Sequence, residues 1–550
     1  MHCVQTCPSC KTRSPPPHSA PCQRIAPRAC DRLHSRCGER HARHPGNRAR
    51  AVQNVRMATP LTTPDTEPTS GSGGTDGNQK QSTLGLPQLT ALVVGSMVGG
   101  GIFGLPMNMA QAAAPGPLLI GWAITGVGML MLALTFTLLA RLAPNPDGGV
   151  YGYARDGFGR FLGFSSAWGY WISALLGNLS YFILVFSTLG LWWPSIFGEG
   201  NTLASLAGQT VLLWLYVALM LRGVREAAGF NLVITIAKIV PILAFVVLTA
   251  VAWDYGVFST DFWGHETTGD SILTQVRGMM IVTVWMFVGI EGATVYSQRA
   301  RNRKDISKAT VVGFLGVIAL LVAVNMLSAG ILSQAELAGL QDPSMAGVLK
   351  EAVGPWGAGL VSVGLLISVI GALLAWMLLC AEILSVTARD GAMPRGLATE
   401  NKHGTATWSV LVSALALQAS IVYAHFAGSN YLVVILMAGS MILLPYLLSA
   451  LYGAALAWRH RNGRGASMVH VVMAAIAALY SLWLIYAGGL NYLLMTMLFY
   501  VPGLLVYLWA QKEGRVRPAM KGYEWVVFGI MLVGFIAALV GLQQGWLSTE

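Results

Sequence analysis

Long apolar stretches separated by short polar loops fill the chain from residue 85 onward. A stretch of about 20 apolar residues is long enough to cross a bilayer as a helix. Thirteen such stretches follow one another, at about 85–113, 117–142, 162–190, 203–222, 228–252, 275–298, 308–332, 357–386, 407–427, 430–457, 467–487, 489–510 and 522–546. The pattern therefore predicts an all-α, polytopic membrane protein with about 13 transmembrane helices. Composition agrees, because 54% of residues are hydrophobic and only 11% are charged, which excludes an ordinary soluble protein.

The first span is interrupted by glycine at its centre. Gly95, Gly99, Gly100 and Gly101 occupy four of seven positions, and each costs a helix about 1 kcal/mol relative to alanine. Non-helical backbone at membrane depth is tolerated only where protein or a polar cavity covers it. An opened helix presents free amide groups and the positive end of a helix dipole, which suit a carboxylate. Glycine-interrupted spans in matching places of two chain halves indicate the binding site of a secondary transporter.

The sixth span, 275–298, contains a second interruption. Gly289 and Gly292 flank Ile290 and Glu291 in the middle of an otherwise apolar segment. An ionisable residue at this depth is a functional hypothesis by default. The alternative is that Glu291 pairs with a buried cation and only joins helices. Because the first and sixth spans each begin a group of five, the paired breaks predict a five-plus-five inverted repeat, followed by three further spans.

The chain is expected to divide into five segments. They are a spurious or disordered Arg/Cys-rich extension at 1–56, a disordered cytoplasmic lead-in at 57–83, repeat 1 at 84–253, repeat 2 at 275–457 and additional spans at 466–546. The extension holds six of the seven cysteines, and eleven basic residues against two acidic ones. It lacks the apolar core of a secretory signal, and we interpret Met57 as the start of the protein proper. Since the extension carries most of the formal net charge of +11, a nucleic-acid partner is not expected.

Basic residues are distributed unevenly among the loops. The loops after the even-numbered spans hold twenty Lys and Arg, whereas the alternate loops hold one, Lys350. Because cytoplasmic loops carry the basic excess, the even loops and the N-terminus are expected in the cytoplasm. An odd number of spans then places the C-terminus outside. The loop at 146–154 fits either a short helix along the inner face or a turn-rich connector.

Lys238 is a further ionisable residue inside a span, the fifth. A buried ammonium needs acceptors, or its pKa falls until it is neutral. The carbonyl groups of the opened first span are candidate acceptors. The alternative is a lysine whose ammonium reaches the end of its helix, but apolar or small neighbours on its N-terminal side oppose this interpretation.

Several motifs together resemble one transporter superfamily. They are GSMVGGGIFGLP (95–106), DGGVYGYARDGFG (147–159), FSSAWGYWISALLGN (164–178), WMFVGIEGATVYS (285–297), RARNRKD (299–305) and TARDGAMP (387–394). On these residues the chain resembles the amino acid–polyamine–organocation superfamily and, within it, the basic amino acid/polyamine antiporters, most of all the bacterial arginine–ornithine antiporters. The resemblance implies secondary-active exchange of cationic amino acids by alternating access, with no enzymatic reaction and no cofactor.

The resemblance also implies roles for individual residues. The substrate-binding residues it implies are Ser96, Met97, Gly99, Gly100, Gly101, Ser173, Ala174, Asn178, Trp285, Ile290 and Trp376, and the gating or coupling residues are Tyr170, Trp285, Glu291 and Lys238. By this resemblance the opened first span binds the substrate carboxylate on its amides, and Trp285 stacks on the cationic tail as a middle gate. Lys238 stands where other branches of the fold bind a sodium ion. Ser96 replaces an asparagine of agmatine-type exchangers. The side chains of the third span, Ser173, Ala174 and Asn178, also differ from the agmatine-type pattern, which fits a different exchange pair.

Other function classes fit the sequence less well. A transporter-fold sensor needs a sizeable soluble output domain, and a membrane enzyme needs catalytic residues clustered in its loops. The partners expected are arginine, ornithine or related cationic amino acids, the lipid bilayer and, as one option, a second copy of the chain, in the bacterial inner (cytoplasmic) membrane. The sequence does not separate arginine/ornithine exchange from two alternatives. These are proton- or potential-driven uptake of basic amino acids, and exchange of lysine, histidine or polyamines.

Overall fold

The computed structural model describes residues 85–143, 149–223, 228–291, 303–428, 431–463, 465–513 and 520–547, with the backbone alone at 92, 228–237 and 303–304. The expected extension and lead-in, 1–83, and the second half of the sixth span, from Gly292 onward, lie outside these residues. Everything described belongs to one compact unit, Gln79–Glu550.

Helices form the fold, and within the described ranges β pairing is limited to an isolated bridge between Glu400 and Ala406. The helical elements are α1 (Leu86–Met97), η1 (Gly100–Gly104), α2 (Leu105–Ala110), α3 (Pro115–Leu142), α4 (Gly149–Phe158), α5 (Arg160–Gly190), α6 (Pro194–Phe197), α7 (Leu203–Leu221), α8 (Ala228–Ala252), α9 (Tyr255–Ser259), α10 (Ile272–Met286), α12 (Arg303–Ser328), α13 (Gln334–Ala338), α14 (Ser344–Val353), α15 (Pro355–Arg389), η3 (Arg395–Ala398), α16 (Thr407–Ala427), α17 (Tyr431–His460), α18 (Met468–Glu513) and α19 (Gly522–Gln544).

In the part of the chain that the structure describes, nine helices are long and apolar enough to cross a membrane, and a tenth crossing is added if α1 and α2 form one broken span. Residues 238–252 of α8 and the whole of α10 are apolar but shorter. The long helix α18 covers two of the predicted spans and bends at Gly489, whose φ of 71° and ψ of 179° are not helical. The all-helical, polytopic class is therefore confirmed. The count of 13 spans and the division into inverted repeats stay predictions.

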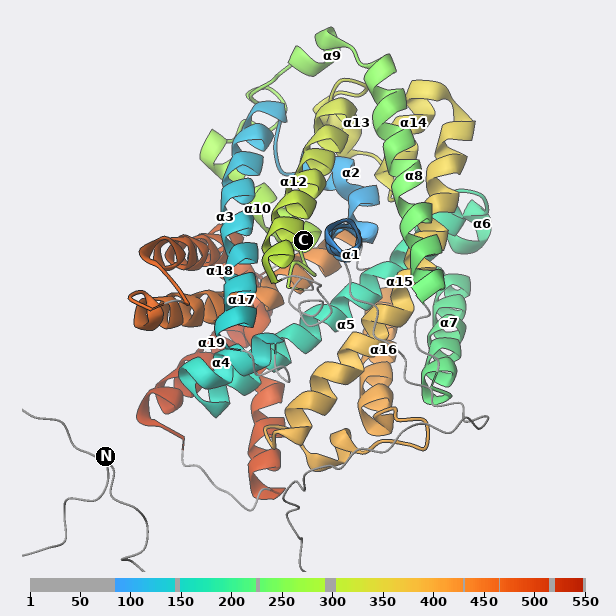
Figure 1. The fold of residues 1–550 in the computed structure, drawn as a ribbon. Helices are drawn as coiled ribbons and strands as arrows, with labels where there is room; N and C mark the ends of the chain where they lie inside the picture. Colours follow the sequence, from blue (N-terminus) through green and yellow to red (C-terminus); the bar gives the residue numbers. More distant parts are fainter. Residues whose placement is uncertain are drawn as a thin grey trace, which may run out of the picture. The chain divides into compact units, whose positions relative to one another are not determined.

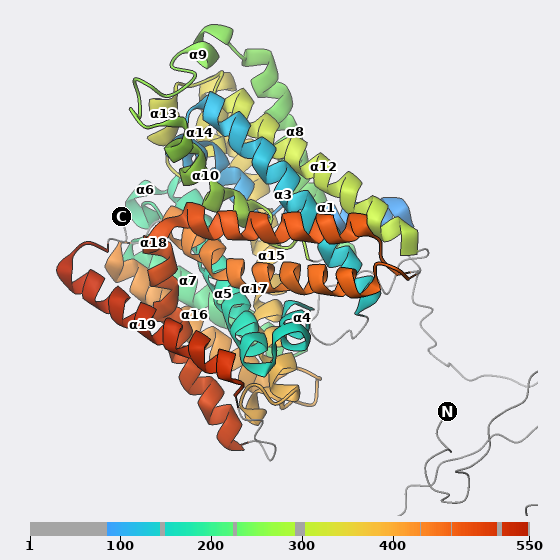
Figure 2. The same ribbon diagram turned by 90° about the vertical axis from the view of Figure 1, so that its left-hand side faces the viewer.

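The central helix is α5. In its most apolar stretch 94% of the residues are buried, against 17% for α19, so α5 lies inside the bundle and α19 at its outside. It packs against α4, α15 and α17, and Figure 1 shows it running between α4 and the region of α6. Helices α18 and α19 pack on each other, at the side of the bundle that Figure 2 faces. Most of the polar contacts described below therefore converge on α5 or its neighbours.

The first span is broken as its glycines predict. The helical pattern of α1 ends at Met97, and η1 begins at Gly100, with a bend of 53° between the two halves of the span. Val98 and Gly99 between them adopt extended backbone. The Val94 carbonyl still accepts from the N–H of Val98 at 2.9 Å, but the carbonyl groups after it lack the next helical turn that would supply their donors.

A second break follows α10 and touches the first. After α10 ends, Gly289 adopts a φ of 103°, a conformation that residues with a Cβ rarely adopt. A Cβ on Gly289 would also lie 2.5 Å from the carbonyl oxygen of Ser96. The two breaks are thus in direct contact, and glycine is required for their close approach.

At one end of the protein, α13 and α14 hold the second half of the broken span. The side-chain Nε2 of Gln334 donates to the Ala110 carbonyl at 3.0 Å, and the N–H of Met107 donates to Ser344 Oγ at 3.2 Å. These bonds fix α2 to the segment between α12 and α15. We refer to this region as the α13 end.

At the opposite end of α5, residues 149–158 form the short helix α4, so the helix rather than the turn-rich connector is correct for this loop. Asp390, just after α15, holds α4 in place. Its Oδ1 lies 3.0 Å from Nη1 of Arg155, and its Oδ2 accepts a hydrogen bond from the Tyr151 hydroxyl. Burial and the neighbouring carboxylate raise the pKa of Tyr151 far above its ordinary value, so the hydroxyl stays a donor. We refer to this region as the α4 end.

Candidate functional site

Lys238 of α8 lies against the break in α1. Its Nζ donates to the carbonyl oxygens of Gly95, at 3.1 Å, and Val98, at 3.0 Å, and the residue is only 5% exposed. The acceptors are available because α1 ceases to be helical at Val98. The ammonium is directed into the protein, where it faces the negative end of the α1 dipole. A lysine that reached the end of its own helix would not make these contacts.

A tyrosine of α5 holds the start of η1. The N–H of Gly100 donates to the Tyr181 hydroxyl at 3.3 Å, and a Cβ on Gly99 would lie 2.7 Å from the same oxygen. The glycines therefore let the opened backbone approach this hydroxyl. The sequence pattern did not single out Tyr181, although it lies three residues beyond Asn178 and thus on the same helix face.

Glu291 accepts hydrogen bonds from two tyrosines on different helices. The Tyr170 hydroxyl of α5 donates to its Oε1 at 2.6 Å, and the Tyr446 hydroxyl of α17 donates to its Oε2 at 2.7 Å. The N–H of Gly289 lies 3.3 Å from Oε2, and Glu291 is 8% exposed. The carboxylate therefore joins α5, α17 and the second break. Sequence reasoning missed Tyr446, for which a hydroxyl in mid-span beside Pro445 was the available signal.

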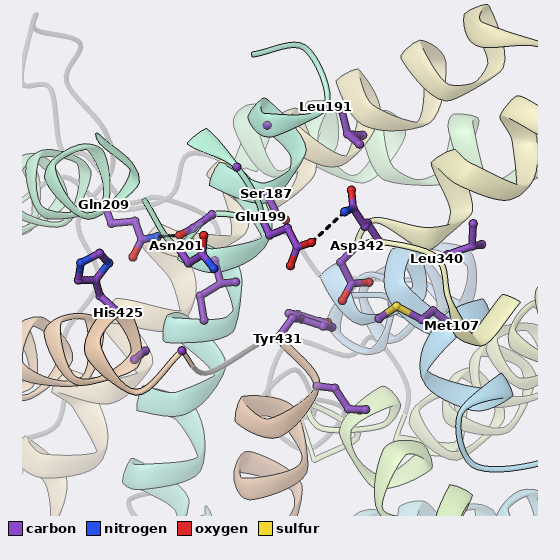
Figure 3. Close-up of a pocket in the computed structure, with 18 of the residues that line it drawn as sticks. Met107, Ser187, Leu191, Glu199, Asn201, Gln209, Leu340, Asp342, His425 and Tyr431 are labelled. Atoms are coloured by element: carbon purple, nitrogen blue, oxygen red, sulfur yellow. Dashed lines mark hydrogen bonds between the residues drawn. The ribbon is translucent and has the colours of Figure 1, made fainter. Parts of the chain in front are cut away.

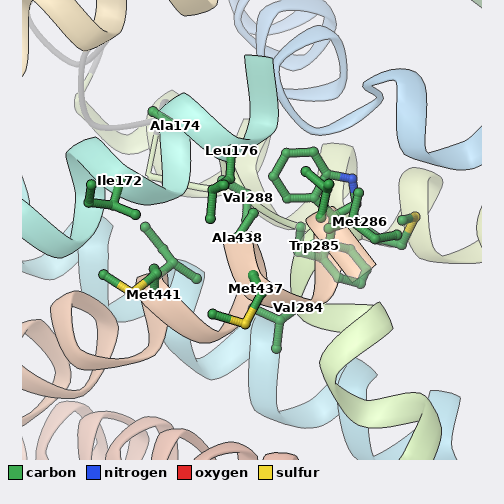
Figure 4. Close-up of a cluster of buried hydrophobic side chains, with 14 of the residues drawn as sticks. Ile172, Ala174, Leu176, Val284, Trp285, Met286, Val288, Met437, Ala438 and Met441 are labelled. Carbon is green, nitrogen blue, oxygen red and sulfur yellow. The ribbon is translucent and has the colours of Figure 1, made fainter. Parts of the chain in front are cut away.

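Aromatic side chains stand beside the breaks. The rings of Trp285 and Trp376 are 6.1 Å apart at an angle of 40°, and Tyr181 meets Trp376 edge to face, also at 6.1 Å. Glycines on two sides make room for Trp285, since a Cβ would lie 2.6 Å from its ring at Gly177 and 3.0 Å from its Nε1 at Gly101. Figure 4 shows Trp285 among the apolar side chains that surround this point.

The breaks, the two tryptophans and Tyr181 enclose a cavity of about 20 Å³, which we call the break cavity. It has room for about one water molecule and not for an amino acid. The residues implied to bind substrate that line it are Ser96, Met97, Gly99, Gly101, Trp285 and Trp376. These residues are thus brought together, in a conformation that is closed around them.

Other expected residues lie behind this wall. Ser173, Ala174 and Asn178 are 0% exposed, and Ile290 is 1% exposed. Ser173 Oγ donates to a backbone carbonyl of α17, and Asn178 Nδ2 donates to the Ala174 carbonyl at 2.9 Å. None of the four lines the break cavity, so in this conformation the structure does not bring them to it.

A larger cavity, of about 320 Å³, lies at the α13 end, and we call it the α13 cavity. It is bounded by the end of α5, the segments between α6 and α7 and between α13 and α14, and the junction of α16 and α17. Figure 3 shows its wall. The sequence did not predict it, because its residues come from helix ends and loops that are far apart in the chain and carry no shared motif.

Comparison with known proteins places the chain in a family. Residues 84–491 match the profile of the amino acid permease family. An arginine/ornithine antiporter of Pseudomonas aeruginosa is 48% identical over 480 residues, which cover 86% of this chain and 99% of the relative. The L-lysine transport protein of Corynebacterium glutamicum is 40% identical over 87% of this chain and 99% of its own. An arginine/agmatine antiporter of Chlamydia abortus is 36% identical over 84% of this chain and 97% of its own.

The family and these relatives are transporters, and the expectation from the motifs is confirmed. The chain is a multi-pass membrane protein that belongs to the amino acid permease family, in the amino acid–polyamine–organocation superfamily, and it is similar to bacterial arginine/ornithine antiporters.

Proposed function

We propose that the protein exchanges cationic amino acids, arginine against ornithine, across the bacterial cytoplasmic membrane by alternating access, and that it is not an enzyme. The observation that carries the proposal is the contact between two broken helices at a closed cavity walled by Trp285 and Trp376. The name of the relative that is 48% identical supports the substrate pair.

The break cavity offers a partner for each part of a cationic amino acid. The first amides of η1 have no acceptor within their own helix and suit the α-carboxylate. Carbonyl groups of the breaks suit the α-ammonium. The faces of Trp285 and Trp376 suit a charged tail, through cation–π contacts worth about 0.5–2 kcal/mol. The cavity has to enlarge to admit the substrate, so the wall residues have to move during transport.

The two ends of the protein differ in how they are closed. Toward the α4 end, Glu291 binds Tyr170 and Tyr446, and Asp390 binds α4. The α13 end has the cavity of about 320 Å³ and, among its described residues, no such tyrosine–carboxylate hydrogen bonds, whereas the cavity of about 390 Å³ at the α4 end lies outside the Glu291 contacts, beside Arg155 and Asp390. We propose that the conformation is closed toward the cytoplasm, because the basic loops would place the α4 end there. The N-terminus would then be cytoplasmic and the C-terminus outside.

Lysine exchange and proton- or potential-driven uptake are the competing functions. One relative is named an L-lysine transport protein, which favours keeping lysine among the candidate substrates. The comparisons give no support to a homodimer, and the exchange mechanism requires none.

Transport by purified protein in lipid vesicles tests the proposal. Labelled arginine should enter vesicles that contain ornithine and should not accumulate in vesicles without a cationic amino acid. Uptake into empty vesicles that follows a membrane potential or a proton gradient would replace exchange by driven uptake. Uptake of a neutral amino acid in preference to arginine, ornithine and lysine would overturn the substrate class.

A further inference from the structure

The α13 cavity has the size of a binding site and is separate from the helix breaks. Its volume of about 320 Å³ falls within the range of about 300–1,000 Å³ that small-molecule sites have. None of its lining residues lines the break cavity. A ligand held here would therefore be additional to one held between the breaks.

The wall of the α13 cavity is negatively charged. Among the described residues it contains two carboxylates, Glu199 and Asp342, and no lysine or arginine. Figure 3 shows both carboxylates directed toward the same part of the cavity. Nε2 of Gln341 donates to Oε1 of Glu199 at 2.8 Å and so fixes the Glu199 carboxylate in place. A concave wall of this charge favours a cation.

Polar groups without a partner gather at one point of the same wall. Oδ1 of Asp342 is shielded from solvent and has no hydrogen-bond partner among the described residues. The Tyr431 side chain beside it is 2% exposed. Both residues lie beside Gly104, where a Cβ would be 2.5 Å from Asp342 Oδ1 and 3.2 Å from the Tyr431 ring. The side-chain amide of Asn108 is 1% exposed and also has no partner among the described residues, and its nitrogen would lie 3.2 Å from the same Cβ on Gly104. Because buried polar groups are nearly always bonded, Asp342 Oδ1 and the amide oxygen of Asn108 indicate a ligand with donors, while the Asn108 amide nitrogen requires an acceptor.

The titration of Asp342 agrees with a cationic ligand. Burial raises the pKa of this carboxyl to about 7, against the lowering effect of the Ser344 N–H. A cation beside it would favour the ionised form. Binding that depends on the carboxylate is therefore present above about pH 7 and lost as the pH falls below it. The other titratable groups that face the cavity are Glu199, His425 of α16 and Tyr431 of α17.

We propose that the α13 cavity is a second substrate site, where Asp342 and the Tyr431 hydroxyl, with Glu199 opposite, bind the guanidinium or side-chain ammonium of a cationic amino acid. The class of substrate rests on the proposed function. A guanidinium carries five N–H donors and so supplies a partner to each of these acceptors. Gly104 is the last residue of η1, so a ligand bound to Asp342 and Tyr431 lies next to the segment that begins at the break. The site holds substrate at the step before it enters the break cavity.

The number of arginine molecules bound by the purified full-length protein tests this site. By equilibrium dialysis at about pH 8, well above the pKa of Asp342, we expect two labelled arginines per chain, the second weaker. Asp342→Asn and Tyr431→Phe should weaken the second by about tenfold or more and leave the first unchanged, which also shows that the variants are folded. Glu351→Gln changes an exposed carboxylate of α14 outside the cavity and should still bind two.

A pH change tests the same site without a substitution. At about pH 6, wild-type protein should bind arginine at the second site as weakly as Asp342→Asn does at about pH 8. The same pH comparison with Glu199→Gln and with His425→Asn separates the contributions of these two side chains from that of Asp342. One arginine per chain, unaffected by Asp342→Asn, would overturn the second site and leave the proposed function standing. Two arginines whose affinities Asp342→Asn does not change would place the second molecule elsewhere. Absence of all arginine binding would overturn the proposed function and, with it, the substrate assigned to this cavity.

Discussion

The ammonium of Lys238 lies 3.0 Å from the carbonyl oxygen of Val98, the residue at which α1 ceases to be helical. A cation attached to the chain therefore occupies the place where the broken helix exposes its carbonyl groups. Lys238 itself supplies a positive charge to the break, and this charge remains when substrate leaves. We therefore expect Lys238 to control the movement of the broken span more than the affinity for substrate.

Substitution of Lys238 tests this expectation. Lys238→Ala leaves two carbonyl groups without this donor, at about 1–3 kcal/mol for each unsatisfied group, so exchange should slow by about tenfold or more while arginine binding persists. Lys238→Arg should also slow exchange, since the planar guanidinium of arginine does not replace a compact ammonium between two carbonyl groups. Exchange and equilibrium binding are measured for both variants. Lys308→Ala, an exposed lysine of α12, is the control, and near-normal exchange by Lys238→Ala would contradict the role.

Gly289 is the residue at which the second break touches the first. Gly289→Ala should lower stability by about 1–3 kcal/mol, because alanine rarely adopts a φ of 103° and its Cβ would meet the Ser96 carbonyl. Gly316→Ala is the matched control, since a Cβ at this position of α12 meets nothing within 4 Å. Thermal unfolding in detergent compares the two. Equal melting temperatures would mean that the breaks are not packed as described.

The hydrogen bond from Tyr446 to Glu291 joins α17 to the second break. Tyr446→Phe removes this donor from a buried carboxylate, so the closed arrangement should be destabilised by about 1–3 kcal/mol. We expect slower exchange with arginine affinity changed much less. Tyr452→Phe alters a tyrosine of the same helix that stacks on Tyr153 instead, and should exchange normally. A loss of affinity as large as the loss of rate would assign Tyr446 to substrate binding rather than closure.

Asp390 fastens α4 to the end of α15. Asp390→Asn weakens a partly exposed ion pair worth about 0.2–1 kcal/mol, so the α4 end should open more often. Cys380, 3% exposed, reports this opening, and we expect its alkylation rate, read by peptide mass spectrometry, to rise about two- to fivefold. Glu400→Gln removes the more exposed pair with Arg389 and should leave the rate unchanged. A rate unaffected by Asp390→Asn would show that this contact does not close the protein.

Local composition was sufficient to predict the long apolar helices and the two breaks, but not short helices such as α13 and α14. Runs of about 20 apolar residues specify membrane helices because the bilayer sets the length, and glycine disfavours a helix wherever it stands. For the same reason the contact partners of Lys238 were foreseeable, since a buried ammonium needs acceptors and the nearest unpaired carbonyl groups are at a broken helix.

Contacts between distant segments were not predictable in this way. Tyr446 meets Glu291 across 155 positions of the chain, and nothing local to either residue identifies the other. The α13 cavity depends on how helix ends and loops from distant parts of the chain meet, and loops carry no periodic pattern from which their packing follows. Ser173 and Asn178 show a different kind of error. The resemblance implies that they bind substrate, but they do not line the break cavity while it is closed.

The most direct test follows both amino acids in the same vesicles. Vesicles that contain protein and ornithine with one label are placed in arginine with a second label, and influx and efflux are counted together. Exchange at the helix breaks predicts that arginine enters as ornithine leaves, one for one, and that Lys238→Ala slows both movements equally. Arginine influx that continues after the internal ornithine is removed would contradict exchange.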